Sequence, residues 1–462
     1  MISSSQAPPA RFYGNGDATL SGTVAFPSVT NLDSRLGASG VAIADFTGDG
    51  VPDIVAANGG NLQCAPAAPC FGGQTARLFA GIGGGRFAPP VDLPSQPGSR
   101  VITGDWNGDL LPDLAFTGAG PQSPQLYILL GIGDGTFAAN GTYNFPGPRL
   151  NGLDAFIVSA RIDAGDSPDL LTASIGTGEV SVFTGDGDGG FTPRPTILFG
   201  VQIECIAPGD FDKDGRADLA VAFKGTLGNL DGKLMVARGN GDGTFQTPVP
   251  LRENVSANWV ATGDFDGDGA LDLAAALEIT RFNWDIEILL GNGDMTFGAP
   301  MPLGTDDGQV GGVCVVDADR DGILDLGVRA GSTTLIGYRG LGDGTFNRAL
   351  LGSAGGGAEM HTDDLDLDGK PDLVTATRSG FFSVQLNTLA QFGIGSPFIR
   401  ISQSGGSIKV AWPLAFREFG IAESQTLTGW KKSERAVEEA ADIFQFFVDP
   451  ADGPWFFRLE RP

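Results

Sequence analysis

Residues 210 to 223 read DFDKDGRADLAVAF, an acidic loop that runs directly into a short apolar segment. Aspartates stand at positions 1, 3, 5 and 9 of the loop, and Gly215 stands at position 6. Calcium is a hard cation that binds about six to eight oxygens, and carboxylates that alternate along a tight loop can all face one ion. A short apolar segment bounded by turn residues is typical of a β-strand. The stretch therefore predicts a calcium-binding loop beside a strand.

The same phrase occurs seven times along the chain. Its loops start at residues 45, 105, 161, 210, 264, 317 and 364. Their mean spacing is about 53 residues, close to the length of a four-stranded propeller blade. A second phrase, Gly-x-Gly-x-Gly-x-Phe, follows each of the first six loops and predicts a tight turn between the third and fourth strands of the repeat. It ends at Phe87, Phe137, Phe191, Phe245, Phe297 and Phe346. The sequence therefore predicts an all-β, seven-bladed β-propeller.

The two ends of the repeat region complement each other. After the seventh loop only two further strand candidates follow, Leu373 to Thr377 and Phe381 to Leu386. The N-terminus carries a glycine turn at Gly14 and an unassigned apolar run from Gly22 to Val29. We predict that the N-terminal strand completes the last blade, because such closure removes the exposed sheet edges.

These repeats resemble the FG-GAP (VCBS) family, the propeller type also found in the head of integrin α subunits. The phrase Phe297-Gly298-Ala299-Pro300 matches the family's name, and the resemblance covers about residues 11 to 390. It implies a calcium-binding propeller over residues 11–392, preceded by a tail over residues 1–10. Propellers of this family serve adhesion, scaffolding and occasionally polysaccharide cleavage, so the resemblance fixes the fold more closely than the function.

Calcium ligands are expected from the side chains at positions 1, 3, 5 and 9 and from the backbone carbonyl at position 7. Loops four to seven match fully, loop one has threonine at position 3, and loop two has Leu110 where the others have the turn glycine. The predicted ligands are Asp45, Thr47, Asp49, Val51 and Asp53; Asp105, Asn107, Asp109, Leu111 and Asp113; Asp210, Asp212, Asp214, Arg216 and Asp218; Asp264, Asp266, Asp268, Ala270 and Asp272; Asp317, Asp319, Asp321, Ile323 and Asp325; and Asp364, Asp366, Asp368, Lys370 and Asp372.

The third loop is degenerate. Arg161 stands at position 1 and Gly165 at position 5, although Asp163 and Asp169 remain. We expect the Arg161 guanidinium to replace the ion there, which leaves six calcium ions per chain, or five if Leu110 disturbs the second loop. For a single loop, a solvated turn is a real alternative because Asp and Gly favour turns. Four complete matches on one frame favour metal binding.

The acidic charge follows the repeats. The chain has a formal net charge of −26, and residues 398 to 462 carry 8 basic and 9 acidic residues, which leaves −25 in residues 1 to 397. Such a surface repels nucleic acid and anionic membranes. No run of 18 apolar residues predicts a transmembrane segment. Met1 to Ser5 lack signal-peptide features, so either a signal has been removed or the protein is cytosolic. We expect the first, with the protein outside the cell or at its surface. In that setting Cys64 and Cys70 are expected to form a disulfide.

Recognition is expected on the face opposite the metal loops, where variable loops such as Arg252 to Asn258 lie. The candidate residues of this site, which would bind a protein or glycan, are Arg100, Trp259, Phe282, Trp284 and Glu359. Packing of these aromatics between blades is the alternative. The one histidine, His361, falls in a strand segment, and no catalytic motif appears, so we expect no enzyme. A polysaccharide lyase or hydrolase using the channel mouth and a subunit of an extracellular polymer remain as alternatives.

Residues 397–462 predict a small β-sandwich-like domain, because the repeat stops and short alternating apolar runs follow. The phrases Trp412-Pro413 and Phe456-Phe457-Arg458-Leu459 resemble a module appended to some bacterial secreted proteins, which favours a bacterial origin. Self-association is a possible role of this domain.

Overall fold

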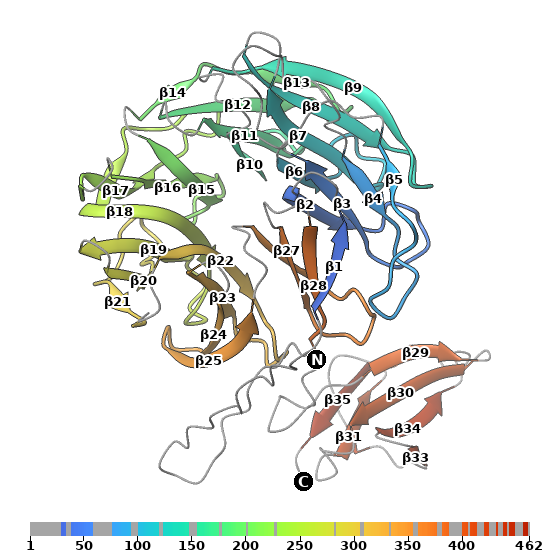
Figure 1. Cartoon of the computed structure of the whole chain (residues 1–462). Coiled ribbons are helices and arrows are strands. Elements are labelled where there is room, and N and C mark those ends of the chain that lie inside the picture. Colours follow the sequence, from blue (N-terminus) through green and yellow to red (C-terminus); the bar gives the residue numbers. More distant parts are fainter. Residues whose placement is uncertain are drawn as a thin grey trace, which may run out of the picture. The chain divides into compact units, whose positions relative to one another are not determined.

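In the computed structural model, the described part of the chain consists of β-strands and the turns between them, without helices (Figure 1). The described residues are 29–33, 38–58, 76–93, 100–119, 123–146, 155–174, 178–199, 202–225, 229–280, 283–304, 309–331, 334–353, 359–376, 381–387, 400–404, 407–413, 420–424, 431–432, 438–440, 443–448 and 456–460. Within these ranges no helix is long and apolar enough to cross a membrane. The chain divides into two compact units, Met1–Ala318 with Ile323–Leu389, and Asp319–Gly322 with Ala390–Pro462.

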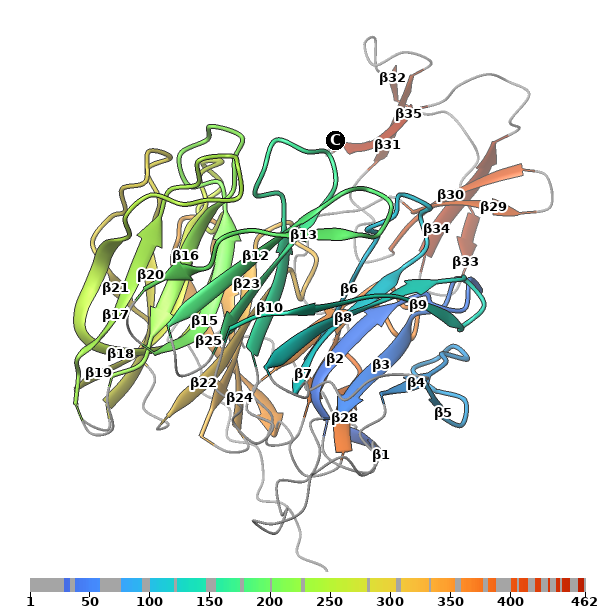
Figure 2. The ribbon, with the colours of Figure 1, turned by 90° about the horizontal axis from the view of Figure 1, so that it is seen from above.

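The first unit is a β-propeller whose antiparallel sheets are arranged around an axis (Figures 1 and 2). Five of its sheets hold one repeat each. They consist of β2 (Ala38–Ala44), β3 (Asp53–Asn58), β4 (Arg77–Phe79) and β5 (Val91–Asp92); β6 (Arg100–Gly104), β7 (Asp113–Ala119), β8 (Pro124–Gly131) and β9 (Phe137–Asn144); β10 (Ala155–Ala160), β11 (Asp169–Ser174), β12 (Glu179–Gly185), β13 (Phe191–Pro193) and β14 (Ile197–Leu198); β22 (Val310–Val316), β23 (Asp325–Ala330), β24 (Thr334–Gly340) and β25 (Phe346–Ser353); and β26 (Met360–Asp363), β27 (Asp372–Ala376), β28 (Phe381–Gln385) and β1 (Val29–Asp33).

The fourth and fifth repeats share one seven-stranded sheet. Its strands are β15 (Ile203–Gly209), β16 (Asp218–Phe223), β17 (Gly232–Ala237), β18 (Val249–Gly263), β19 (Asp272–Thr280), β20 (Asn283–Leu289) and β21 (Met301–Pro302). The structure thus has five separate blades and not the seven that the repeat count predicted. The cause is β18, which pairs with β17 through its first half and with β19 through its second half. Residues 252–258, predicted as a variable loop, are part of this strand.

The N-terminal strand closes the propeller, as predicted. β1 pairs antiparallel with β28, from Val29 opposite Gln385 to Asp33 opposite Phe381 (Figure 1). The strand is Val29–Asp33, and residues 22–28 of the expected run lie outside the described residues. Closure leaves the sheet of the seventh repeat with four strands, although the C-terminal part of the repeat supplies only three.

The strand after each acidic loop is the most buried part of its repeat. In β16 all residues from Leu219 to Phe223 are 0% exposed, and β11 is buried along its whole length. Such strands are apolar without alternation because neighbouring sheets cover both of their faces. The innermost strands β2, β6, β10, β15, β18, β22 and β26 contact one another in that order, and β26 contacts β2. The acidic loops therefore follow one another around the ring.

The described strands of the second unit form two antiparallel sheets. One sheet has the order β29 (Arg400–Ser404), β30 (Ser407–Pro413), β34 (Ile443–Val448) and β33 (Glu438–Ala440). The other has the order β32 (Lys431–Lys432), β31 (Gly420–Ser424) and β35 (Phe456–Glu460).

Candidate metal centres

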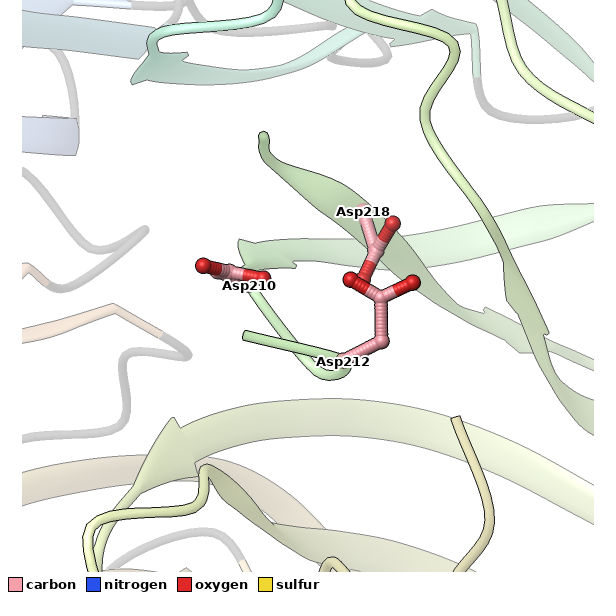
Figure 3. A group of neighbouring side chains, drawn as sticks. All are labelled: Asp210, Asp212 and Asp218. Carbon is pink, nitrogen blue, oxygen red and sulfur yellow. The ribbon is translucent and has the colours of Figure 1, made fainter. Parts of the chain in front are cut away.

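Four acidic loops bring three carboxylates together. Each group uses the aspartates at loop positions 1, 3 and 9, and one oxygen of each lies within 4.8 Å of the others. Figure 3 shows the fourth loop, in which Asp210 and Asp212 come from the turn and Asp218 begins β16. The groups are Asp210, Asp212 and Asp218; Asp264, Asp266 and Asp272; Asp317, Asp319 and Asp325; and Asp364, Asp366 and Asp372. These loops are the four that the sequence matched completely.

The donor set fits a hard cation. Oxygens that bind the same calcium ion at about 2.4 Å are separated by at most about 4.8 Å, so each triad is compact enough for one ion. The ligands are oxygens only, which excludes the nitrogen and sulfur sets typical of zinc. Three carboxylates held this close repel one another, and a dication removes that repulsion.

The backbone of the loops is set by left-handed residues at positions 4 and 6. In the fourth loop these are Lys213, with φ 58°, and Gly215, with φ 82°. In the second loop Leu110 takes φ 67° at position 6, where five other loops have glycine. A non-glycine residue pays about 1 kcal/mol for this conformation, yet the turn itself is kept. The expectation that Leu110 would disturb the second loop therefore finds no support in its backbone.

The hydrogen bonds of the incomplete first and second loops repeat those of the complete ones. Asp105 accepts the N–H groups of Gly108 (2.8 Å) and Leu110 (3.0 Å), as Asp264 accepts those of Gly267 (2.8 Å) and Gly269 (3.0 Å). Asp45 accepts Gly48 and Gly50 in the same way, both at 2.7 Å. Thr47 and Asn107 thus stand at position 3 of normally folded loops.

The aspartate at position 9 has a second role that the sequence did not reveal. Its two oxygens accept the N–H of position 2 and the N–H that opens the glycine turn. In the fifth repeat, Asp272 accepts Phe265 and Gly291, both at 2.7 Å. The same pair of bonds occurs in the first six repeats, at Asp53, Asp113, Asp169, Asp218, Asp272 and Asp325. In the seventh repeat, Asp372 accepts Leu365 at position 2 and Asn387, which takes the place of the turn glycine. This carboxylate therefore clamps the acidic loop to the glycine turn of its own repeat.

Burial shifts the titration of these clamping aspartates. Desolvation, opposed by the backbone hydrogen bonds and reinforced by nearby carboxylates, raises the pKa of Asp218 and Asp272 to about 6 and that of Asp372 to about 7. The pKa values of Asp53, Asp113 and Asp169 are also raised, mainly by desolvation. A bound cation would favour the ionised form of each group.

The third loop differs from the others in backbone and in charge partner. Neither Ala164 at position 4 nor Asp166 at position 6 is left-handed. Asp163 pairs with Arg194 at 3.7 Å, whereas Arg161 is exposed and forms no ion pair within the described part of the chain. The expectation that Arg161 neutralises the loop is therefore wrong, because the cation comes from the segment after β13. The clamp at Asp169 persists, since its hydrogen bonds do not depend on a metal.

In loops one, two, four and five, the residue at position 2 joins the loop to the next repeat, a role that the spacing of the acidic residues does not indicate. The carbonyl of Phe46 accepts the N–H of Gly135 (2.8 Å), and its ring packs edge-on against Phe137 at 5.7 Å between centroids. The same two contacts join Trp106 to the third repeat, Phe211 to the fifth and Phe265 to the sixth. In the sequence, the phenylalanine that ends the glycine turn of the next repeat is the mark of this contact.

The fourth loop contains a cation of the protein itself. Arg238, at the end of strand β17, forms an ion pair with Asp212, whose side chain is 1% exposed. The corresponding residues before the glycine turns of the fifth and second repeats are Leu290 and Leu130. A guanidinium at this place neutralises one ligand without an ion.

Three of the five side chains proposed for the opposite face, Arg100, Trp259 and Glu359, belong to one cluster at the innermost strands. Arg100 pairs with Glu359 and lies over the Phe156 ring, 4.6 Å from its centroid, and Phe156 packs edge-on against Trp259 at 5.4 Å. Arg100 and Glu359 belong to the second and seventh repeats, which border the first repeat on either side, so their side chains meet beside the first repeat. Gly40 of the first repeat leaves space for them, since a Cβ there would lie 3.0 Å from Glu359 Oε2.

The other candidates are placed elsewhere. Trp284 is 8% exposed within the core between the fifth and sixth repeats, and Phe282 lies outside the described residues, as do Cys64 and Cys70. Cys205 and Cys314 are free thiols whose pKa values desolvation raises to about 12 and about 11. Desolvation, with a smaller contribution from the charge of Arg100, lowers the pKa of His361 to about 4.

Comparison with known families supports the repeat assignment. Residues 162–221 and 210–275 each match the FG-GAP-like repeat. The first match runs from the third acidic loop into the strand after the fourth, and the second match spans the fourth and fifth loops. No curated protein is similar enough to the chain to count as a match. The chain thus carries FG-GAP-like repeats in a β-propeller.

Proposed function

We propose that this protein is an extracellular recognition, adhesion or assembly module whose propeller is stabilised by calcium. The observation that carries the proposal is the position of the acidic loops at the joints of the ring. In the fourth loop, the ligands Asp210 and Asp212 flank Phe211, whose carbonyl and ring contact the fifth repeat. An ion that fixes those ligands also fixes the residue that holds the next repeat.

Calcium is the cation that best suits these loops. The proposed ligands combine several carboxylates with one backbone carbonyl. Calcium accepts roughly six to eight oxygens in a flexible geometry, whereas magnesium demands a near-ideal octahedron and keeps more of its water. Calcium is also abundant outside cells, where a loop of moderate affinity stays filled. The FG-GAP-like match of loops three to five agrees with this choice.

We further propose that a protein or glycan ligand binds on the face opposite the metal loops. Arg100, Glu359, Phe156 and Trp259 contact each other there, and this packing gives the surrounding loops a rigid base. The ion pair neutralises both charges, so the rim of the cluster would contribute aromatic contact more than net charge.

The proposal is tested in two steps on the full chain. The melting temperature is measured with calcium, with magnesium and with excess chelator, and calcium alone should raise it strongly. Glycan and protein arrays are then probed with and without calcium, together with turnover assays on acidic polysaccharides. Binding that needs calcium supports a recognition module. Turnover of a polysaccharide would contradict the recognition module and favour an enzyme. An unchanged melting curve in chelator would refute the calcium role.

A further inference from the structure

Exposed aliphatic side chains gather on one arc of the metal-loop face. Ile82, Ile132 and Leu341 occupy the second position of the glycine turns in repeats one, two and six, and they are 56%, 55% and 44% exposed. Leu110 and Leu367 occupy acidic loops two and seven, and they are 88% and 54% exposed. We name these five residues the aliphatic arc. Among the described residues, the other large exposed apolar side chains, Val91, Leu198 and Val249, lie in outer strands.

The arc is continuous around the ring, because repeats six, seven, one and two are neighbours. Loops and turns also share one face, since the glycine turns of repeats two, three, five and six contact the acidic loop of the preceding repeat; Gly135 N, for example, donates to Phe46 O at 2.8 Å. On the rest of the face the same turn position holds Asp186, Asn240 and Asn292. The metal-loop face is therefore divided into an aliphatic and a polar part.

Two members of the arc are kept at a conformational cost. Leu110 has φ 67° and Leu367 has φ 62°, at positions where other loops have glycine. Glycine takes this conformation freely, whereas a leucine there is strained. Exposure of these side chains adds nothing to the stability of the folded chain. Their placement indicates a surface that a partner covers.

Charge indicates which kind of partner it is. The acidic loops of repeats one, two, six and seven carry 14 aspartates at positions 1, 3, 5 and 9, and Asp134 and Asp343 stand beside Ile132 and Leu341. Arg86, Arg320 and Lys370 are the cationic side chains of these loops and turns. Four calcium ions, each with about two positive charges, would leave the arc acidic. An anionic membrane is repelled by such a surface, whereas a segment that alternates cationic and aliphatic side chains complements it.

We propose that the aliphatic arc docks a basic amphipathic protein segment on the metal-loop face. Aliphatic side chains of the segment cover Ile82, Ile132 and Leu341, and its lysines or arginines face the surrounding carboxylates. This surface is distinct from the ligand face proposed above, and the two proposals fail independently.

The chain itself supplies the test variant. Ile82→Asn, Ile132→Asn and Leu341→Asn together give these turns the residue that repeats four and five already have, as Asn240 and Asn292. The full chain in calcium is titrated with a synthetic peptide of alternating leucine and lysine and with a serine–lysine peptide of equal charge. The triple variant should bind the leucine–lysine peptide at least about tenfold more weakly, while its weaker binding of the serine–lysine peptide stays unchanged. The reciprocal variant, Asn240→Ile with Asn292→Ile, should bind the leucine–lysine peptide more tightly, which keeps the test decisive if the triple variant does not fold.

Three outcomes would overturn the proposal. Equal binding of the leucine–lysine peptide by wild type and triple variant shows that the arc is not the contact. Capture of the wild type by anionic vesicles, without capture of the triple variant, would show that the arc binds a membrane and not a protein segment. If the wild type self-associates and the triple variant does not, the arc binds a second copy of the chain.

Discussion

The ring of Phe265, in the fifth acidic loop, packs edge-on against Phe346 of the sixth repeat, with 5.6 Å between the ring centroids. The backbone N–H of Phe265 donates to Asp272 at 2.7 Å, and its carbonyl accepts from Gly344 at 3.1 Å. One residue of the metal loop thus touches its own clamp and the neighbouring repeat. Metal binding and repeat-to-repeat contact are therefore expected to be coupled.

This joint predicts a measurable coupling between the two rings. Phe265→Leu and Phe346→Leu should each destabilise the propeller, and the double variant should lose about 1 kcal/mol less than the sum of the single variants, the usual worth of an edge-to-face pair. Urea denaturation in saturating calcium measures the cycle. Phe245→Leu is the control variant. The residue at position 2 of the preceding loop is Ile162, so this substitution removes no aromatic pair there. Additive losses at Phe265 and Phe346 would contradict the joint.

The clamp predicts that two aspartates respond differently to calcium. Asp169→Asn should cost about 1–3 kcal/mol with or without calcium, because the amide nitrogen replaces one of the two carboxylate oxygens and cannot accept the N–H of either Ile162 or Gly185. Asp268→Asn, at position 5 of the fifth loop, should destabilise mainly in calcium. Melting curves in calcium and in chelator compare the two variants. A loss at Asp169 that disappears in chelator would show that the third loop binds the ion.

Arg238 predicts a graded affinity among the complete loops. Calcium must displace the guanidinium from Asp212, so Arg238→Leu should raise the affinity of the fourth loop about tenfold, or about 1.4 kcal/mol. Leu290→Arg should weaken the fifth loop, where leucine now occupies the same place. Calorimetric titration resolves the weakest class of sites in each variant. Unchanged affinities in both variants would show that Arg238 does not compete.

The pKa values of the clamping aspartates predict an inverted pH dependence without calcium. The folded chain raises the pKa of Asp218 and Asp272 from 3.8 to about 6 and that of Asp372 to about 7. The folded state therefore binds protons more tightly than the unfolded state, and stability falls as pH rises from about 4 to about 7. The turn aspartates Asp134 and Asp343 have lowered pKa values, so their titration changes the stability only below about pH 4.

Calcium should reverse that slope, because the ion binds the ionised carboxylates and protons compete with it. Melting temperatures between pH 4 and 7, recorded in chelator and in calcium, test both signs. A chelated protein that gains stability across this range would show that the buried carboxylates are ionised in the folded state at low pH.

Local spacing predicted much of the site, because calcium ligation demands a fixed pattern of oxygens along one loop. The triads of loops four to seven follow directly from the aspartates at positions 1, 3 and 9. The closing strand was also predictable, since the strand count of the last repeat was incomplete. Both features depend on residues that are close in sequence or on a simple count.

Contacts between repeats could not be predicted in this way. Arg194 reaches Asp163 from a segment without any motif, whereas Arg161 occupied the place that the pattern marked. The shared sheet of repeats four and five depends on β18 continuing through Asn254, which has φ 58°. A long-range ion pair and a strand that continues past an irregular residue have no signature in the spacing of the loops.

The number of calcium ions bound per chain tests the account most directly. Native mass spectrometry of the full chain, with equilibrium dialysis and metal analysis as a second count, gives this number without assuming any affinity. The account predicts five or six calcium ions, with the third loop empty because Arg194 pairs with Asp163 and the left-handed residues of the other loops are missing. Fewer than five ions, or a seventh ion, would contradict it.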